Sequence, residues 1–235
     1  EGMVAAAALA ALLAMLLVAS PARAEQSGGS PASPVLLADP DASYALAGQW
    51  DMLRDPQGLL AIADVAAPAQ AQRFERLAGN LSLGYGRDVI WLRFALQRAP
   101  DAPEHWWLSA QPSFVQHLTL YAPQPGGGLQ EMRSGGLLPL SERALPARGL
   151  LFSVQPGTQP AYYYLRLESA GTRALGVRLQ TADGYARSAL LADVRIGMLI
   201  GMFSLSAVTG LICALWLRQS FFWVATAYMV VFGLL

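Results

Sequence analysis

Two apolar blocks flank a middle segment in which hydrophobic and polar residues alternate. The blocks cover residues 3–19 and 196–235, and the alternating segment covers about residues 44–182. Within that segment, short runs of period two are separated by Pro and Gly clusters at a spacing of roughly ten residues. This pattern is typical of an all-β sandwich or barrel, whereas the second apolar block predicts membrane-spanning helices.

Nine short runs of the middle segment are predicted strands, which is enough for two packed antiparallel sheets. They cover residues 44–50, 59–65, 88–96, 105–110, 114–122, 129–133, 149–154, 162–168 and 174–180. The segment Pro123–Gly128, PQPGGG, predicts a hairpin loop, because Gly tolerates a positive φ and Pro ends strand pairing. Residues 68–78 are predicted to form the helical turn of this domain.

The N-terminal apolar block has the features of a secretory signal. It is followed by Pro21 and by the small-x-small triplet Ala22-Arg23-Ala24. We therefore predict that residues 1–24 are a signal peptide, and the alternative is an uncleaved anchor helix. Residues 25–43 are predicted to be a flexible linker, since their first part is rich in Gly, Ser and Pro and has no apolar pattern.

The C-terminal apolar block divides into two predicted transmembrane helices. Residues 196–217 contain no charge and would span about 33 Å as a helix, enough for a hydrocarbon core of about 30 Å. A signal peptide places the middle domain in the periplasm, so residues 218–220, which include Arg218, are predicted to form a cytoplasmic hairpin. Residues 221–235 would begin a second helix that is too short to cross, so we expect a multi-pass protein of the bacterial inner membrane that continues further.

Residues 183–195 are predicted to be a juxtamembrane connector that leads helically into the first membrane helix. At the outer end of that helix, Gly197 and Gly201 form a GxxxG pattern. Small residues at this spacing allow close packing between helices in lipid. The pattern is compatible with general packing in a helix bundle surrounded by membrane lipid, or with a homodimer through the membrane helices.

Charge and composition exclude several function classes. The chain is 54% hydrophobic and only 14% charged, and its 16 basic residues balance its 16 acidic ones, so nucleic acid is not an expected partner. Cys213 is the single cysteine and lies in the predicted membrane helix, which leaves the exported domain without a disulfide or a thiol nucleophile. The two histidines lack the spacing of a metal site, and no nucleophile motif is present. We predict no cofactor, no metal and no enzymatic activity within this segment.

Two predicted strands carry aromatic and basic residues on one face. On the strand 88–96, Trp91 and Arg93 point away from the face that holds Ile90, Leu92, Phe94 and Leu96. On the strand 162–168, Tyr164 and Arg166 share a face in the same way. If both faces belong to one sheet, they form a groove that could hold a planar or hydroxylated ligand. The alternative is structural: the arginines pair with Glu168 or with carbonyl groups, and the aromatic rings cover the sheet.

Five separated motifs resemble one family. They are SLGY (82–85), VIWLRF (89–94), LTLYAP (118–123), RSGGLLPLSERALPAR (133–148) and YYLRLES (163–169). In this order they resemble the type 2 extracellular domain of bacterial seven-transmembrane receptors with diverse intracellular signalling modules. The resemblance covers about residues 44–182, and the helices from residue 190 onward resemble the start of the family's membrane region.

The resemblance implies a jelly-roll-like sandwich akin to carbohydrate-binding modules, placed before seven helices and a cytoplasmic output such as a diguanylate cyclase or histidine kinase. It supplies no established ligand residues. Our candidate site residues are Trp91, Arg93, Arg143, Tyr164 and Arg166. The leading hypothesis is the sensory input portion of such a receptor, with a small-molecule or carbohydrate ligand in the periplasm. The alternative is a membrane-anchored module that binds a glycan or a protein without signalling.

Overall fold

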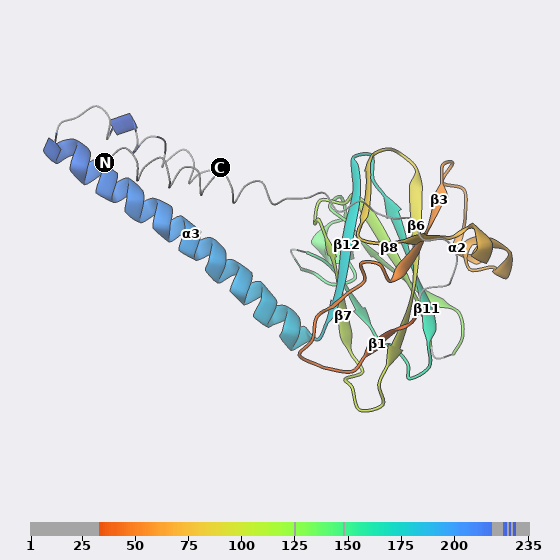
Figure 1. Ribbon diagram of the computed structural model, residues 1–235. Helices are drawn as coiled ribbons and strands as arrows, with labels where there is room; N and C mark the ends of the chain where they lie inside the picture. The colour runs from red at the N-terminus through yellow and green to blue at the C-terminus, as the bar shows by residue number, and fades with distance from the viewer. Residues whose placement is uncertain are drawn as a thin grey trace, which may run out of the picture.

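A β-sandwich and a long helix make up the computed structural model, which describes residues 33–124, 126–147, 149–217, 223, 224, 226 and 228. Two sheets pack face to face, and the helix α3 (Ala182–Leu217) leaves from one end of the sandwich (Figure 1). The predicted all-β sandwich followed by an apolar helix is confirmed. The predicted signal peptide, residues 1–24, lies outside the described residues.

The larger sheet has seven strands and the smaller sheet has five. The larger sheet has the order β4-β3-β6-β11-β8-β9, with β1 paired in parallel to β6. The smaller sheet has the order β10-β7-β12-β2, with β5 paired to β12. The strands are β1 (Val35–Leu37), β2 (Tyr44–Ala45), β3 (Trp50–Asp55), β4 (Glu75–Leu77), β5 (Leu81–Tyr85), β6 (Val89–Arg98), β7 (Trp106–Gln111), β8 (His117–Pro123), β9 (Leu129–Ser134), β10 (Leu150–Val154), β11 (Ala161–Glu168) and β12 (Thr172–Gln180). Three short helical segments are α2 (Ile62–Val65), η1 (Pro68–Arg73) and η2 (Leu140–Glu142).

The main core lies between the two sheets and is built by residues of alternating parity. Ile90, Leu92, Phe94 and Leu96 of β6 are all fully buried in it, as the period-two pattern predicts. The indole of Trp50 donates a hydrogen bond to the carbonyl oxygen of Gly79 at 2.7 Å, so this large buried ring leaves no unsatisfied donor. The hairpin predicted at Pro123–Gly128 joins β8 and β9, and Gly127 and Gly128 adopt positive φ there.

Two predicted strands are wrong, each for a tertiary reason. Residues 59–65 form no strand; they end in α2, whose apolar side chains pack on the outer face of the larger sheet. The run 44–50 is split between the two sheets, because the chain turns at Gly48, which has a φ of +75°, before β3 begins. The predicted helical segment 68–78 is helical only to Arg73, and β4 follows.

Part of the predicted linker is also wrong. Val35–Leu37, within the range 25–43, form β1 and pair in parallel with the end of β6. Leu37 is fully buried in the main core, which explains why this stretch is ordered despite its weak pattern. The three strands β1, β4 and β5 have at most five residues each, too few to show a period of two.

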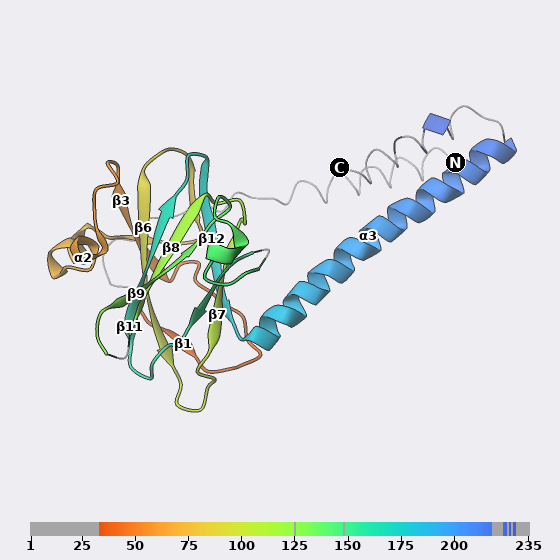
Figure 2. The ribbon, with the colours of Figure 1, turned by 180° about the vertical axis from the view of Figure 1, so that it is seen from behind.

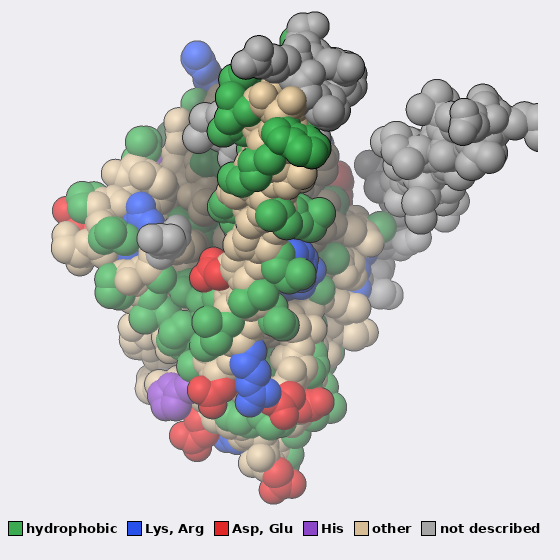
Figure 3. Space-filling model, turned by 90° about the vertical axis from the view of Figure 1, so that its left-hand side faces the viewer, with side chains coloured by type: hydrophobic (Ala, Val, Ile, Leu, Met, Phe, Trp, Pro, Cys, Tyr) green, Lys and Arg blue, Asp and Glu red, His purple; other side chains and the backbone are tan. Residues whose placement is uncertain are grey.

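The connector and the first membrane segment form one continuous helix. α3 has 36 residues and is therefore about 54 Å long. By length and composition, Ala182–Trp216 is a helix that could cross a membrane. Figure 3 shows hydrophobic side chains following one another along this helix. The predicted hairpin 218–220 lies outside the described residues, as does most of the predicted second helix.

The glycines of α3 face two different environments. A Cβ atom built on Gly210 would lie 2.6 Å from the hydroxyl of Thr226, so Thr226 lies against this side of the helix. Cβ atoms built on Gly197 and Gly201 would meet no described atom within 4 Å. The homodimer through this surface stays a prediction.

Candidate functional site

A row of polar and aromatic side chains crosses the outer face of the larger sheet. Directly opposed residues of antiparallel strands project to the same face, so the strand register defines the row. From β4 to β9, the row consists of Arg76, Asp51, Arg93, Tyr164, Tyr121 and Glu131. We call this set the cross-strand row. It includes one residue from each of six strands.

The two strand faces singled out from the sequence belong to the same sheet. Arg93 of β6 lies opposite Tyr164 of β11, and Trp91 lies opposite Arg166. A common groove was predicted on the condition that both faces belong to one sheet, and they do. The chain between β3 and β4 then divides this face, because α2 and η1 lie across it on the side of the sandwich away from α3 (Figures 1 and 2).

Trp91 lies beneath this covering segment and is fully buried. Val65 of α2 and Phe74, which follows η1, pack with Trp91 and Tyr164 in a second, smaller apolar core. The Trp91 ring also stacks on Tyr121 at a centroid distance of 5.7 Å. Because no surface of Trp91 is exposed, a ligand on this face could not contact it, and its burial favours the structural interpretation for this residue.

One cleft on this face lies between the covering segment and strands β3, β6 and β11. Its volume is about 610 Å³. We call it the Arg93 cleft; its lining includes Asp51, Phe74, Arg76, Arg93, Tyr162 and Tyr164, together with small apolar residues of α2 and η1. Of the five site residues predicted from the sequence, the structure brings Arg93 and Tyr164 together here.

The floor of the Arg93 cleft holds a buried carboxylate between two guanidinium groups. Asp51 is only 3% exposed and accepts a hydrogen bond of 2.9 Å from Nη2 of Arg93. Nη1 of Arg76 lies 3.4 Å from the other carboxylate oxygen. Removing one of these opposite charges would leave a buried charge without its partner. The carboxylate and the guanidinium groups therefore stabilise one another.

Aromatic rings fix the orientation of the Arg93 guanidinium. Its Cζ atom lies 4.2 Å from the ring centroid of Phe74 and 5.3 Å from that of Tyr162. Burial raises the pKa of Tyr164 above its ordinary value, and the positive charge of Arg93 opposes the shift. The Tyr164 phenol therefore keeps its proton at neutral pH. The cleft thus offers cations, a carboxylate, phenol groups and apolar surface, which are elements of a small-molecule binding site.

A second, smaller cleft lies over strands β8, β9 and β11 and has a volume of about 390 Å³. We call it the Arg166 cleft. Arg166 forms an ion pair with Glu168 and lies 5.8 Å from the Trp91 ring centroid, so the structural pairing considered for it is realised. The buried hydroxyl of Ser134 lines this cleft and finds no hydrogen-bond partner among the residues that the structure describes. The predicted single groove is therefore two clefts, with Arg166 in a different one from Arg93.

Arg143 lines neither cleft, although it contacts Leu138 of the Arg166 cleft. Its Nε donates a hydrogen bond of 3.0 Å to the carbonyl oxygen of Leu138, and its Nη1 lies 3.4 Å from that of Ala147. These contacts tie together the loop that contains η2. The structure thus places Arg143 in a loop-stabilising position and does not bring it together with the other four candidates.

The site residues predicted from the sequence did not include four charged or aromatic residues of the Arg93 cleft: Asp51, Phe74, Arg76 and Tyr162. Asp51 alternates with Trp50 and Met52, so its outward direction could have been predicted from the period of two. Tyr162 has the same parity as Tyr164 and could have been included with it. Phe74 and Arg76 carry no local signal, because they reach the cleft only through the path of the covering segment. Among the described residues, no group of three or more His, Cys, Asp or Glu side chains is placed to hold a metal ion.

The comparison with protein families identifies an extracellular receptor domain in this chain. The family described as 7TMR-DISM extracellular 2 matches residues 47–181, which is more than half of the chain. The chain therefore belongs to this family of extracellular domains of seven-transmembrane receptors. The candidate membrane helix α3 begins directly after the matched region. A comparison with curated proteins found no match.

Proposed function

We propose that this chain is the sensory input portion of a bacterial transmembrane signalling receptor, and that its exported domain binds a small molecule or carbohydrate in the Arg93 cleft. The observation that carries the proposal is the cleft itself. A cavity of about 610 Å³ combines a guanidinium stacked on aromatic rings with a buried carboxylate, in the extracellular domain of a receptor family. Cavities of this size and mixed chemistry commonly hold small ligands.

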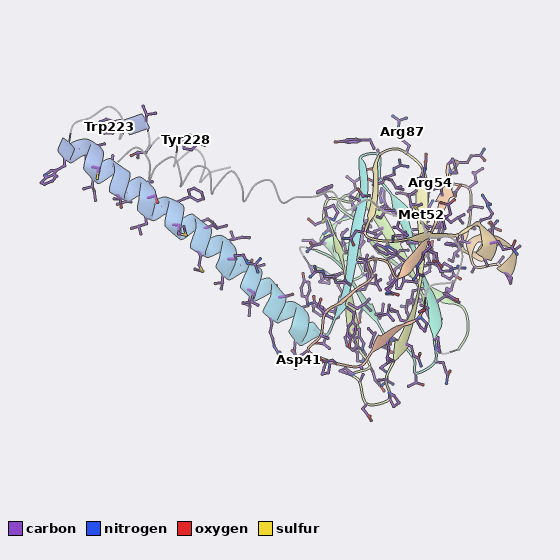
Figure 4. The ribbon with its side chains drawn as sticks, viewed as in Figure 1. Asp41, Met52, Arg54, Arg87, Trp223 and Tyr228 are labelled. Atoms are coloured by element: carbon purple, nitrogen blue, oxygen red, sulfur yellow. The ribbon has the colours of Figure 1, made fainter. Side chains whose placement is uncertain are left out.

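The relay to the membrane is proposed to pass through the first turns of α3. The Tyr185 ring lies 5.5 Å from the ring of Trp107 on β7. Nη1 of Arg187 lies 2.7 Å from the carboxylate of Asp41, which Figure 4 labels at the base of the helix. These contacts support a helix whose first turns move together with the sandwich.

A second contact between the sandwich and the helix lies at the start of α3. The hydroxyl of Thr181 donates a hydrogen bond of 2.9 Å to the carbonyl oxygen of Pro40 and accepts one of 3.1 Å from the amide of Gly184. Thr181 is thus both an N-cap of the helix and a contact to the turn that contains Asp41. That turn follows β1, which pairs with β6, the strand that carries Arg93. A shift of β6 on ligand binding would reach α3 through this connection.

The finer features of the receptor are part of the same proposal. The sandwich would lie in the periplasm, the chain would cross the bacterial inner membrane more than once, and α3 would run from outside to inside. The output would be a cytoplasmic module such as a diguanylate cyclase or a histidine kinase. Ligand binding would act only if the ligand prefers one of two conformations, since equal affinity for both shifts neither.

Ligand titration of the whole chain in lipid nanodiscs tests the binding part of the proposal. We expect at least one member of a panel of sugars and small organic anions to raise the melting temperature, since a ligand at about 100 times its Kd stabilises by about 2.7 kcal/mol. Tyr162→Ala should remove this effect because its ring is part of the cleft wall. If no member of the panel stabilises the protein, direct small-molecule sensing by this domain is contradicted.

A distance measurement separates the receptor from the alternative of a non-signalling anchored module. Spin labels on Asp101→Cys in the sandwich and Asp193→Cys in α3, in a Cys213→Ser background, report how the helix is held. A signalling receptor should change this distance distribution when ligand is added. A module that only tethers a glycan or protein should bind its ligand with no change.

A further inference from the structure

We infer that the ligand of the Arg93 cleft carries a carboxylate attached to a ring. This inference rests on the proposed function and narrows it to one chemical class. The sequence as a whole has a formal net charge of zero, so a preference for anions must come from the local arrangement of charges. The cleft supplies that arrangement, together with apolar surface for the ring.

The charged side chains of the cleft lining favour a ligand with a negative charge. Its charged residues are Asp51, Arg76 and Arg93, so two positive charges face one negative charge and leave a surplus of one. Both guanidinium groups contact the same carboxylate, Arg93 at 2.9 Å and Arg76 at 3.4 Å. Two guanidinium groups carry more N–H donors than one carboxylate can accept. A second carboxylate, supplied by the ligand, would balance both the charge and the hydrogen bonds.

The burial and hydrogen bonding of Arg93 also favour an anionic ligand. The residue is only 9% exposed, and its buried Nε has no hydrogen-bond partner within the described part of the chain. A buried cation with an unsatisfied donor indicates a shortage of acceptors around it. Phe74 and Tyr162 hold the guanidinium from the sides, so it would lose little conformational freedom when an anion binds.

The ring portion of the ligand is inferred from the walls. Tyr162 is 43% exposed and offers an aromatic face at the edge of the cleft. The covering segment contributes small apolar side chains, among them Val65, Ala67, Pro68 and Ala71. A planar or puckered ring fits between such walls, whereas a small inorganic anion would leave them without contact.

The surroundings separate this cleft from the other one. An adjoining hollow beside β3 and β4 is lined by Arg54, Arg73 and Glu75, again with a surplus of one positive charge. In the Arg166 cleft, by contrast, Arg133 pairs with Glu131 and Arg166 pairs with Glu168. Positive potential near an entrance raises the local concentration of anions. The anion preference therefore belongs to the Arg93 cleft and its rim.

The test compares acids with their neutral counterparts on the whole chain in lipid nanodiscs. Calorimetric titration would use glucuronate against glucose and benzoate against benzyl alcohol, at constant ionic strength. We expect one of the two acids to bind at least about tenfold more tightly than its neutral counterpart. Tight binding of glucuronate alone identifies a sugar acid, and tight binding of benzoate alone identifies an aromatic acid.

Arg76→Gln is the decisive variant, because Asp51 keeps its pairing with Arg93 and the fold is spared. It should lower the affinity for the acid by about tenfold and leave any binding of the neutral compound unchanged. Arg178→Gln is the matched control, since Arg178 is an exposed arginine on β12 of the smaller sheet. It should change neither affinity.

Two outcomes would overturn the inference. If a neutral compound binds as tightly as its acid, Arg76→Gln has no effect and Tyr162→Ala abolishes binding, the cleft is a ligand site without anion preference, and the proposed function stands. If neither acid binds, the carboxylate class is wrong. The proposed function then fails separately, only if the wider panel of sugars and anions also gives no stabilisation.

Discussion

The outer faces of the two sheets are covered by different parts of the chain. Over the larger sheet lie α2 and η1, and beneath them Asp51 and Arg93 form a buried ion pair. Beside the smaller sheet lies the start of α3, which contacts Trp107 on β7. Figure 4 shows this separation, with Asp41 at the base of α3 and with Met52 and Arg54 of β3 on the other side of the sandwich. The proposed ligand cleft and the candidate membrane helix are thus on opposite faces of one core.

The comparison shows how a compact sandwich could connect two distant surfaces. The sheets share a single continuous core, so a change in the curvature of one is felt by the other. The strand β1 adds a hydrogen-bonded route, since it pairs with β6 and continues into the turn that contacts the start of α3. Variants that change only one of the two outer faces should show whether these faces are coupled.

The largest effect is expected from Trp91→Ala, which empties the small core under the covering segment. Deleting a buried Trp costs about 3–5 kcal/mol of unfolding free energy, because the surrounding side chains cannot fill the space. Thermal and denaturant unfolding followed by circular dichroism measures it. Trp107→Ala on the opposite face is the matched control and should cost clearly less, since Trp107 is only partly buried. Equal losses for both variants would contradict the assignment of Trp91 to a core.

The next effect is expected from Arg93→Met, which leaves the carboxylate of Asp51 with only the longer contact to Arg76. The expected loss is about 3 kcal/mol, at the lower end of what breaking a buried pair costs. The double variant Asp51→Leu, Arg93→Met should recover part of this loss, because no unpaired buried charge remains. Denaturant unfolding of the unaltered protein, of Asp51→Leu and Arg93→Met alone and of the double variant gives the coupling energy. A double variant as unstable as the sum of its parts would exclude the pairing as the cause.

A smaller effect should appear at alkaline pH, through the tyrosines of the larger sheet. Burial raises the pKa of Tyr163 to about 12, above the value of 10.0 in the unfolded chain. The stability that the folded protein gains from this raised pKa is therefore fully present below pH 10. It is lost as the pH rises towards 12, and about 1.4 kcal/mol of the unfolding free energy is lost by pH 11. Unfolding free energies at pH 8 and pH 11 test this. Tyr163→Phe should lose less stability between these two values, and an identical loss would assign the effect to other groups.

The smallest stability effect, with a clear structural readout, is expected at the junction with α3. Asp41→Ala removes an exposed ion pair and should change the unfolding free energy by less than about 1 kcal/mol. It should nevertheless broaden the distance distribution between the labels at positions 101 and 193, because Arg187 no longer holds the helix. The double variant Asp41→Arg, Arg187→Asp exchanges the two charges and should narrow the distance distribution again. A distribution unchanged by Asp41→Ala would show that the other contacts suffice.

Several features of the site could be predicted from the sequence because they depend on local parity. The alternation along β6 and β11 placed Arg93, Tyr164 and Arg166 on outward faces, and their register in one sheet agrees with the groove hypothesis. The partner of Arg93 could not be predicted, since Asp51 is 42 residues away in the chain. The division of the groove also depends on the covering segment, of which residues 59–65 were predicted as a strand and residues 68–78 as a helical turn.

The sequence by itself determined the sandwich, the apolar helix and the faces of the long strands, because hydrophobic periodicity is a property of neighbouring residues. The tertiary structure alone decided that β1 joins the larger sheet, that α2 and η1 cover Trp91, and that Asp51 lies between two arginines. These features depend on strand register and on the burial of short segments. Both are set by contacts between residues far apart in the chain, which no local pattern records.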